Sequence, residues 1–228
     1  MKRYEMMHCY NFRDLGGCPS ATGFFPDGVF FRSDAPINLT KEEIDQIYHL
    51  GVRTVIDLRY PDESERRYSS LTTDKRFTCY NISLGTGSLP ESEEAIPESY
   101  LQFVQNEMAM QPILEILAHS DHATLFHCTA GKDRTGVIAA ILYLLADCKE
   151  EDIIADYQVS YTFIKKIIER LRRDNPDLPA YAGQSKPEYM EQFLQRFHQS
   201  YGSVTNYLRA IGLTEESMIK LKEKVTYI

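Results

Sequence analysis

The sequence lacks tryptophan and has no excess of basic residues. Its 228 residues include 25 Lys and Arg against 33 Asp and Glu, which gives a formal net charge of −8. Proteins dedicated to nucleic acids or to anionic membranes need clustered positive charge. The composition therefore predicts no nucleic-acid partner, although it says nothing of one local pocket.

Cysteine is scarce, and its pattern excludes two structural uses. The five cysteines are Cys9, Cys18, Cys79, Cys128 and Cys148. An odd number, wide spacing and a long chain are not typical of a disulfide framework. No two of them form a CxxC pair, so a structural zinc site is not expected. We predict a reduced, intracellular protein without a metal site.

Long apolar runs are also missing. The longest, Val137 to Ala146, is much shorter than the ~20 residues that span a bilayer. The N-terminal stretch has no apolar core of a signal peptide. We therefore expect a cytoplasmic protein without stable membrane insertion, while export by a route that needs no signal peptide is compatible with the same sequence.

The first half of the chain reads as alternating strands and helices, and a further strand follows it. Thr40 and Glu43 have the spacing of a capping box, which begins a helix that Gly51 ends. A second helix is expected from about Pro97, and Pro112 either interrupts it or starts another. The expected strands are Val29–Phe31, Thr54–Leu58, Phe77–Leu84 and Ala123–His127.

The last third is helical throughout, because apolar residues recur every three or four positions from Tyr157 to Leu171. A break at Asn175–Pro179 is followed by helices over 188–201, 204–211 and 215–225, the last with Thr214 as its N-cap. We predict one α/β domain over residues 1–228. A central, mostly parallel sheet is flanked by helices, and about 150–200 forms a helical insertion or lid within a C-terminal extension.

The most informative stretch is HCTAGKDRTG, which runs from His127 to Gly136 between an apolar strand and an apolar helix that starts at about Thr135. Free backbone amides at a helix N-terminus form a cradle for anions. Gly131 allows close approach of the backbone to a ligand, and Arg134 can bind two phosphate oxygens. In this positive field we expect Cys128 to be a thiolate at neutral pH.

Three other interpretations of this stretch are weaker. A buried structural cysteine does not explain Gly131 and Arg134 at fixed offsets. A nucleotide P-loop needs Ser or Thr after the lysine and a glycine five positions before the second one, where this chain has Asp133 and Phe126. A cysteine protease needs a separate histidine base and has no use for the arginine.

HCTAGKDRTG resembles the signature loop of the cysteine-dependent phosphatases, in which a cysteine and an arginine are separated by five residues. Its Lys-Asp version is similar to that of the atypical bacterial tyrosine and dual-specificity phosphatases, some of which also act on phosphoinositides. The resemblance runs from about residue 10 to about 225. Further stretches fit it in the expected order: Asn11–Gly17, Phe31–Ser33, Val55–Arg59 followed by Glu63, Tyr201-Gly-Ser and Tyr207-Leu-Arg.

The resemblance implies a two-step displacement. Cys128 attacks phosphorus to form a phosphocysteine, which water then hydrolyses. Arg134 stabilises the transferring phosphoryl group together with the amides of Thr129, Ala130, Gly131, Lys132 and Asp133. Thr135 would offer its hydroxyl to the thiolate or to the leaving step, and His127 would orient the loop. No metal or organic cofactor is needed.

The sequence offers two sets of candidates for the general acid. Many relatives place an aspartate some thirty residues before the cysteine, but this chain has only glutamates in that window: Glu91, Glu93, Glu94 and Glu98. The resembling bacterial family uses the aspartate of the loop, here Asp133, which is favoured because it lies within reach of the leaving oxygen. Alternatively, Asp133 only pins the loop. Asp57 is expected to be a structural partner of Arg59 or of the loop amides.

The substrate class depends on fewer signals. Lys132 is either a cation for substrates with more than one phosphate or a solvent-facing side chain at the pocket rim. The basic stretch from Lys165 to Arg173 is either a guide for phosphorylated substrates or the solvated face of its helix. We expect a phosphorylated protein, above all at tyrosine, or a phosphoinositide as substrate. The alternative is a catalytically silent module that binds phosphorylated ligands.

Overall fold

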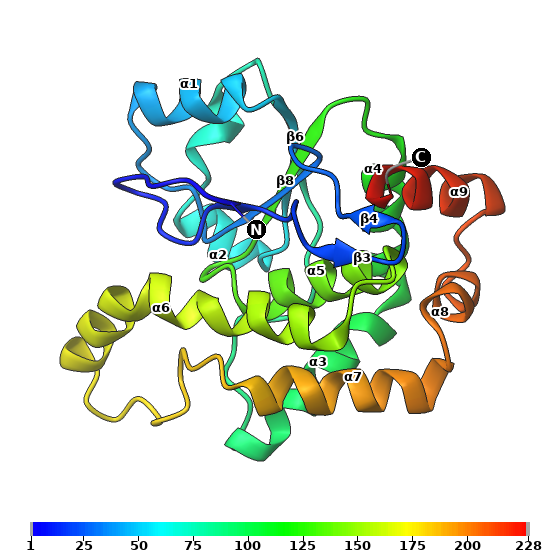
Figure 1. The fold of residues 1–228 in the computed structure, drawn as a ribbon. Coiled ribbons are helices and arrows are strands. Elements are labelled where there is room, and N and C mark those ends of the chain that lie inside the picture. Colours follow the sequence, from blue (N-terminus) through cyan, green and yellow to red (C-terminus); the bar gives the residue numbers. More distant parts are fainter. Residues whose placement is uncertain (1, 227–228) are drawn as a thin grey trace.

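The computed structural model describes residues 2–226 and has a six-stranded sheet at its centre (Figure 1). The strand order is β1-β2-β5-β8-β6-β7, and the last four of these strands are parallel. A two-stranded hairpin, β3 with β4, lies outside the sheet. The strands are β1 (Lys2–Arg3), β2 (Arg13–Asp14), β3 (Pro19–Ser20), β4 (Gly23–Phe24), β5 (Phe30–Ser33), β6 (Val52–Asp57), β7 (Thr78–Asn81) and β8 (Ala123–His127).

The three central parallel strands end in register. His127 at the end of β8 lies opposite Ser33 of β5 on one side and Asp57 of β6 on the other. β8 is buried throughout, as its run of apolar residues predicted. Because parallel strands share one carboxyl edge, the loops that follow β5, β6 and β8 meet there, where α/β folds bind ligands.

Helices cover both faces of the sheet, and Figure 1 shows α1 apart from the layer formed by α3, α5, α6 and α7. A smaller apolar cluster packs under α1, and a larger one joins the opposite face to the helices from α3 to α9. The helices are α1 (Lys41–His49), α2 (Pro61–Arg66), η1 (Ser70–Thr73), η2 (Glu93–Ala95), α3 (Ile96–Gln105), α4 (Glu107–His119), α5 (Asp133–Leu145), α6 (Glu150–Asp174), α7 (Pro187–Tyr201), α8 (Val204–Ala210) and α9 (Glu215–Val225).

The predicted mixed α/β architecture is confirmed, and so are several local signals. Thr40 and Glu43 form the reciprocal capping box at the start of α1. Gly51 adopts φ +89° directly after this helix. Thr214 caps α9 by accepting a hydrogen bond from the backbone N–H of Ser217 at 3.1 Å.

Both alternatives for Pro112 are wrong. The chain breaks at Asn106, and Pro112 lies inside the second helix, six residues into α4. A proline there removes the hydrogen bond to the carbonyl four residues earlier. That carbonyl belongs to Met108, which is 91% exposed, so water can satisfy it. The short helix α2 was not expected, and it carries a residue of the site.

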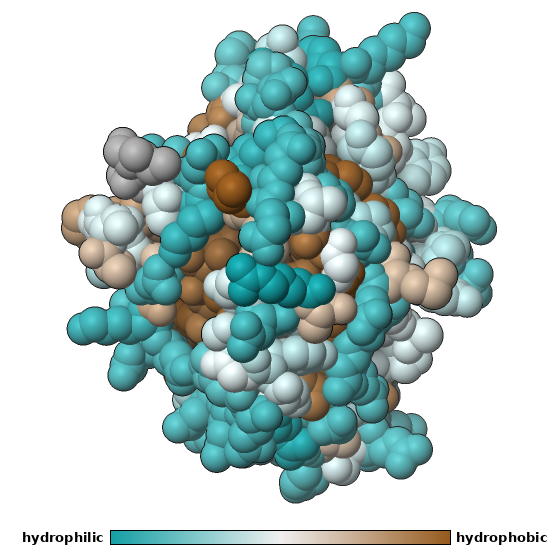
Figure 2. Space-filling view, turned by 90° about the vertical axis from the view of Figure 1, so that its right-hand side faces the viewer, coloured by the Kyte–Doolittle hydropathy of each residue, from teal (hydrophilic) through white to brown (hydrophobic). Residues whose placement is uncertain are grey.

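The face formed by α8 and α9 is mostly hydrophilic, with apolar side chains in small recesses (Figure 2). A groove of about 320 Å³ between the end of α5, α8 and α9 is lined by residues such as Met218 and Ile219. Within residues 2–226 there is no helix with both the length and the apolar character that a bilayer crossing requires.

Candidate active site

The signature loop connects β8 to α5 at the carboxyl edge of the parallel strands. Cys128 directly follows β8, and α5 begins at Asp133, two residues earlier than the sequence indicated. The loop amides therefore lie at the N-terminus of a buried helix, where they and the helix dipole favour an anion. Cys128 is 3% exposed, so its thiol is enclosed rather than presented on the surface.

The carbonyl groups of the loop are held by two side chains, one from β5 and one from the segment before β2. Asn11 donates from Nδ2 to the carbonyls of Ala130 (3.0 Å) and Gly131 (2.9 Å). Arg32 donates from Nη2 to Gly131 at 2.8 Å and to Lys132 at 3.4 Å. In a trans peptide the N–H points away from the C=O, so fixing these carbonyls also fixes the direction of the following amides.

Gly131 is required by its surroundings. Its φ is +65°, a left-handed conformation that side chains disfavour. A Cβ at this position would lie 2.3 Å from the carbonyl carbon and oxygen of Ser33. The loop therefore packs directly on the end of β5, and the glycine expected for close approach to a ligand also allows close approach to the neighbouring strand.

Arg134 is held by a carboxylate from α2. Its Nη1 and Nη2 donate to Glu63 at 2.7 and 3.0 Å, and the hydroxyl of Thr129 donates to the same carboxylate at 2.5 Å. Arg134 is 5% exposed. Burial alone would raise the pKa of Glu63, but the hydrogen bonds from Arg134 and Thr129 lower it to about 2. The carboxylate is therefore ionised at neutral pH.

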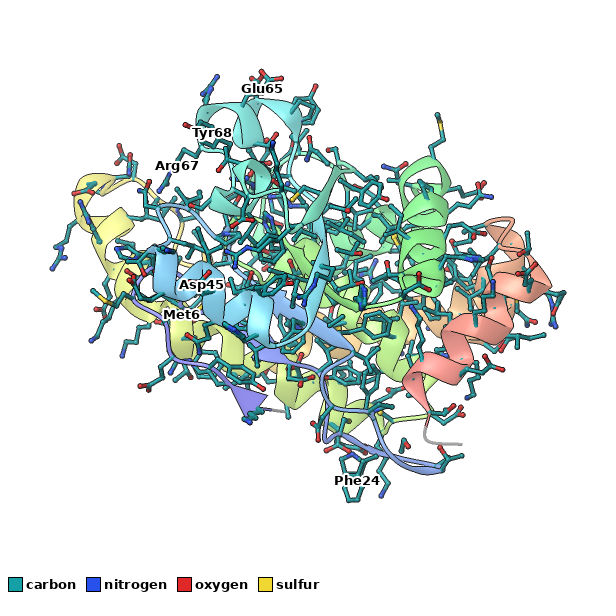
Figure 3. All side chains as sticks on the ribbon, turned by 90° about the horizontal axis from the view of Figure 1, so that it is seen from above. Met6, Phe24, Asp45, Glu65, Arg67 and Tyr68 are labelled. Carbon is teal, nitrogen blue, oxygen red and sulfur yellow. The ribbon has the colours of Figure 1, made fainter. Side chains whose placement is uncertain are left out.

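Helix α2 is oriented so that Glu63 faces the site, whereas Glu65, two residues later, faces solvent. Figure 3 shows Glu65 of this helix, and Tyr68 two residues after its end, at the outside of the molecule, and both are exposed. Glu63 lies on the opposite side and turns toward Arg134. Of the three carboxylates of this helix, Glu63 belongs to the site, whereas Asp62 and Glu65 are exposed to solvent.

Asp133, the favoured general acid, lies at the first position of α5. Its carboxylate accepts a hydrogen bond from the hydroxyl of Tyr100 and lies 3.0 Å from Nζ of Lys132. The hydroxyl of Tyr100 also contacts that of Tyr157 at 2.7 Å. Burial and the charge of Asp133 raise the pKa of Tyr100 well above its ordinary value, so the phenol stays protonated. The Asp133 side chain is 38% exposed and reachable by a ligand.

Lys132 is not the solvent-facing side chain that one interpretation predicted. It is 4% exposed, and Nζ donates to the carbonyl of Gln184 at 2.5 Å. Gln184 belongs to the segment between α6 and α7, so Lys132 connects the signature loop to the helical extension. Nζ of Lys132 also lies beside the first residue of α5, at 3.0 Å from the Asp133 carboxylate.

The three supporting residues lie next to the signature loop: Asp57 ends β6, His127 ends β8, and Thr135 lies in the first turn of α5. Asp57 binds Arg59 through both oxygens, at 2.9 and 2.6 Å, as one prediction stated. Nδ1 of His127 lies 3.7 Å from the Asp57 carboxylate, and burial lowers the pKa of His127 to about 4, so the ring is neutral. Thr135 is fully buried, and among residues 2–226 its hydroxyl has no hydrogen-bond partner, so the structure does not show the expected contact of this hydroxyl with the Cys128 thiol.

Two of the glutamates considered as acids are bound to other side chains. Glu93 pairs with Lys186 and accepts a hydrogen bond from the Tyr189 hydroxyl at 2.6 Å. Glu98 pairs with Arg196 at 2.7 Å. Glu93 thus connects η2 to the start of α7, and Glu98 connects α3 to α7.

Sequence reasoning assigned no role to several residues of this site. Asn11, Arg32 and Glu63 stand in stretches that resembled the phosphatase family, and this was the available signal for them. Tyr100 and Asp156 had no such signal, because their neighbours in the site are distant in sequence.

The fold and the loop together define a cysteine-dependent phosphatase. The family model described as "Tyrosine phosphatase family" matches residues 4–227. The chain belongs to this family and is a protein-tyrosine phosphatase. The resemblance of its signature loop is thereby confirmed.

One relative supports this assignment, and two further proteins show weaker similarity. A protein named tyrosine-protein phosphatase from Nostoc commune is 31% identical over 224 residues, which cover 88% of this chain and 75% of the relative. The triple specificity protein phosphatase PtpB of Mycobacterium tuberculosis is 24% identical, with 96% and 97% covered. The core catalytic domain of the PP-IP phosphatase SIW14 from S. cerevisiae is 18% identical with a TM-score of 0.42, covering 77% of this chain and 98% of that domain.

Proposed function

We propose that the enzyme hydrolyses phosphate monoesters through a phosphocysteine. The Sγ of Cys128 forms a bond to phosphorus while the bond from phosphorus to the leaving oxygen breaks, and Asp133 gives that oxygen a proton. Water then attacks phosphorus, passes a proton to Asp133, and breaks the S–P bond. Inorganic phosphate leaves, and both residues return to their starting states.

The observation that carries this proposal is the geometry around Cys128. Side chains from β5 and from the segment before β2 hold the carbonyls of the loop, and Glu63 fixes the guanidinium of Arg134. A cradle of oriented amides next to a fixed arginine suits the charge of a transferring phosphoryl group. The fixed donors need little rearrangement when the charge develops, so they contribute more than donors in water would.

We propose Asp133 as the general acid rather than a glutamate of residues 91–98. Asp133 is half-exposed at the loop and is oriented by Tyr100 and Lys132. Glu93 and Glu98 already have partners on α7 or at its N-terminus. The alternative, in which Asp133 only holds the loop in place through backbone amides, is distinguished by the kcat of Asp133→Asn.

For the substrate, we propose phosphotyrosine in proteins, with activity toward phosphoserine, phosphothreonine or phosphoinositides in addition. The triple specificity named for the M. tuberculosis relative supports a broad range. Lys132 supports substrates with a second phosphate only if it exchanges the Gln184 carbonyl for that phosphate. The acidic net charge supports partners other than nucleic acids, and the unpaired cysteines support a reducing, cytoplasmic compartment.

We further propose one catalytic domain over residues 1–228, in which about 150–200 forms a wall beside the site. The segment between α6 and α7 supports this, because the hydroxyl of Tyr181 donates to the carbonyl of Pro90 at 2.7 Å and Gln184 binds Lys132. Two loops that are distant in sequence therefore meet next to the signature loop. Arg172 donates to carbonyls within 179–182, which favours a structural role for this part of the basic stretch.

The proposal is tested with phosphotyrosine, phosphoserine and phosphothreonine peptides and phosphoinositide vesicles, with the wild type and Cys128→Ser. We expect turnover of phosphotyrosine by the wild type, and loss of at least 10³-fold in the variant with ligand binding retained. Binding without turnover in the wild type would support the silent module instead. Equal activity of the two proteins would refute the phosphocysteine.

The acid is tested by the dependence of kcat on the leaving group. Asp133→Asn should lower kcat about 100-fold for an alkyl phosphate, which needs a proton, and much less for p-nitrophenyl phosphate, which does not. Glu91→Gln and Glu94→Gln are the matched controls. If one of the glutamine variants shows this dependence and Asp133→Asn does not, the assignment is wrong.

A further inference from the structure

Three charged side chains form a buried cluster behind the signature loop. They are Arg13 of β2, Arg32 of β5 and Asp156 of α6, and both arginines are fully buried. Oδ1 of Asp156 accepts from Nε of Arg13 at 2.8 Å, and Oδ2 accepts from Nη1 of Arg32 at 2.5 Å. Burial disfavours the charge of Asp156, but the two arginines lower its pKa below the ordinary value. One carboxylate thus holds two guanidinium groups.

The first route from Asp156 to the loop passes through Arg32. The guanidinium uses Nη1 for Asp156 and Nη2 for the carbonyl of Gly131, at 2.8 Å. Because the guanidinium is planar and rigid, the carboxylate at one end sets the direction of the donor at the other. Burial and the charge of Arg13 lower the pKa of Arg32 to about 10, which still leaves it protonated at neutral pH.

The second route passes through Arg13 and Asn11. Nη1 of Arg13 donates to the side-chain oxygen of Asn11 and to its carbonyl, at 3.2 Å for the latter. This leaves the Asn11 amide nitrogen turned toward the loop, where it donates to Ala130 and Gly131. Both routes end on the same carbonyl, that of Gly131, and both begin at Asp156.

The neighbouring residue of α6 reaches the loop as well. The ring of Tyr157 packs against Gly136, where an added Cβ would lie 3.1 Å from it, and its hydroxyl contacts Tyr100, which binds Asp133. Two consecutive residues of α6 therefore contact groups that hold the loop: Asp156 binds Arg32, and Tyr157 contacts Tyr100. The first half of α6 is a fixed part of the site, although it begins the region expected to form an insertion or lid.

We propose that Asp156 is a positioning residue for catalysis: through Arg32 and the Arg13–Asn11 pair, it fixes the Gly131 carbonyl and with it the amides that bind the transferring phosphoryl group. This inference rests on the proposed function. Asp156 touches no reacting atom. Its removal leaves two buried arginines without their shared partner, so the Gly131–Lys132 peptide loses its fixed direction, and small misplacements of such donors lower rates strongly.

The test compares Asp156→Asn with Asp156→Glu and with Glu151→Gln, an exposed position on the same helix. Three quantities are measured well below each variant's Tm: kcat and KM for p-nitrophenyl phosphate, and inhibition by orthovanadate, which resembles the transition state. We expect Asp156→Asn to lower kcat about 30-fold or more and to weaken vanadate inhibition in proportion. Asp156→Glu should recover part of both, and Glu151→Gln should equal the wild type.

A merely structural role gives a different result, because it lowers Tm while kcat of the folded protein and vanadate inhibition stay unchanged. That result would overturn the proposal. If Asp156→Asn does not fold, Asn11→Ala is used instead, because it removes the uncharged side chain that links Arg13 to the Gly131 carbonyl. This variant should weaken vanadate inhibition about tenfold. Inhibition at the wild-type level in Asn11→Ala would also refute the inference. Lack of turnover in the wild type would instead refute the proposed function.

Discussion

The pairing of Glu63 with Arg134 makes a quantitative prediction about stability and pH. A pKa lowered from 4.5 to about 2 corresponds to ~3 kcal/mol at full effect. The Glu63 side chain is 26% exposed, so solvent screening reduces this to about 1–2 kcal/mol. We therefore expect Glu63→Gln to unfold with a free energy about 1–2 kcal/mol below that of the wild type at pH 7.

The sign of the pH dependence follows from the direction of the shift. Because the pKa of Glu63 is lower in the folded protein, its stabilisation is complete above the pKa of the unfolded chain, about 4.3, and is lost as pH falls toward 2. The difference between wild type and Glu63→Gln should therefore be constant from pH 7 to pH 5 and shrink below pH 4.5. Urea unfolding at pH 7, 5, 4 and 3.5 measures it directly.

A matched control separates this pair from surface charge in general. Glu65→Gln removes an exposed carboxylate from the same short helix and should change stability by less than about 0.5 kcal/mol at every pH. A Glu63→Gln difference that stays the same or grows at low pH would refute the reasoning. The same variant should raise KM for an aryl phosphate, because Arg134 is no longer held in place.

Two further changes test the loop and its acid. Gly131→Ala should lower the free energy of unfolding by about 2–4 kcal/mol in urea melts, because its Cβ would meet the Ser33 backbone. Gly28→Ala has a similar φ but open space around the Cβ, so its free energy of unfolding should fall by only about 1 kcal/mol. Equal losses in the two variants would contradict this reasoning. Tyr100→Phe should lower kcat for an alkyl phosphate roughly tenfold by freeing Asp133, while Tyr143→Phe, which loses a buried hydroxyl bond to Leu15, should leave kcat unchanged. A kcat at the wild-type level in Tyr100→Phe would show that the hydroxyl does not orient the acid.

The sequence predicted the features that depend on neighbours along the chain. The capping box of Thr40 and Glu43 is complete within four residues, and the strand before Cys128 is a single apolar run. The strand–loop–helix context of the signature loop is equally local. These patterns predict local structure because few other conformations satisfy them.

The sequence did not predict the partners that tertiary folding supplies. Glu63 and Arg134 are 71 positions apart, and Arg32 and Asp156 are 124 apart. Neither pair has a spacing rule, since the distance between them depends on how β5, β6 and α6 pack. Lys132 was ambiguous for the same reason: whether it faces solvent depends on the segment around Gln184, which follows the C-terminal end of α6 and contacts Lys132.

The charge of the whole chain and the charge of the site act over different distances. At physiological ionic strength, exposed charges more than about 8 Å apart are largely screened, so most of the 33 carboxylates hardly affect a phosphate bound at the loop. Arg32 and Arg134 are buried and screened much less, and each is held by a carboxylate that also fixes its geometry. Because these carboxylates offset much of the arginines' charge, the direction of the loop amides must supply much of the attraction for phosphate. A residue that fixes this direction, such as Asp156, therefore affects catalysis more than its distance from the reacting atoms suggests.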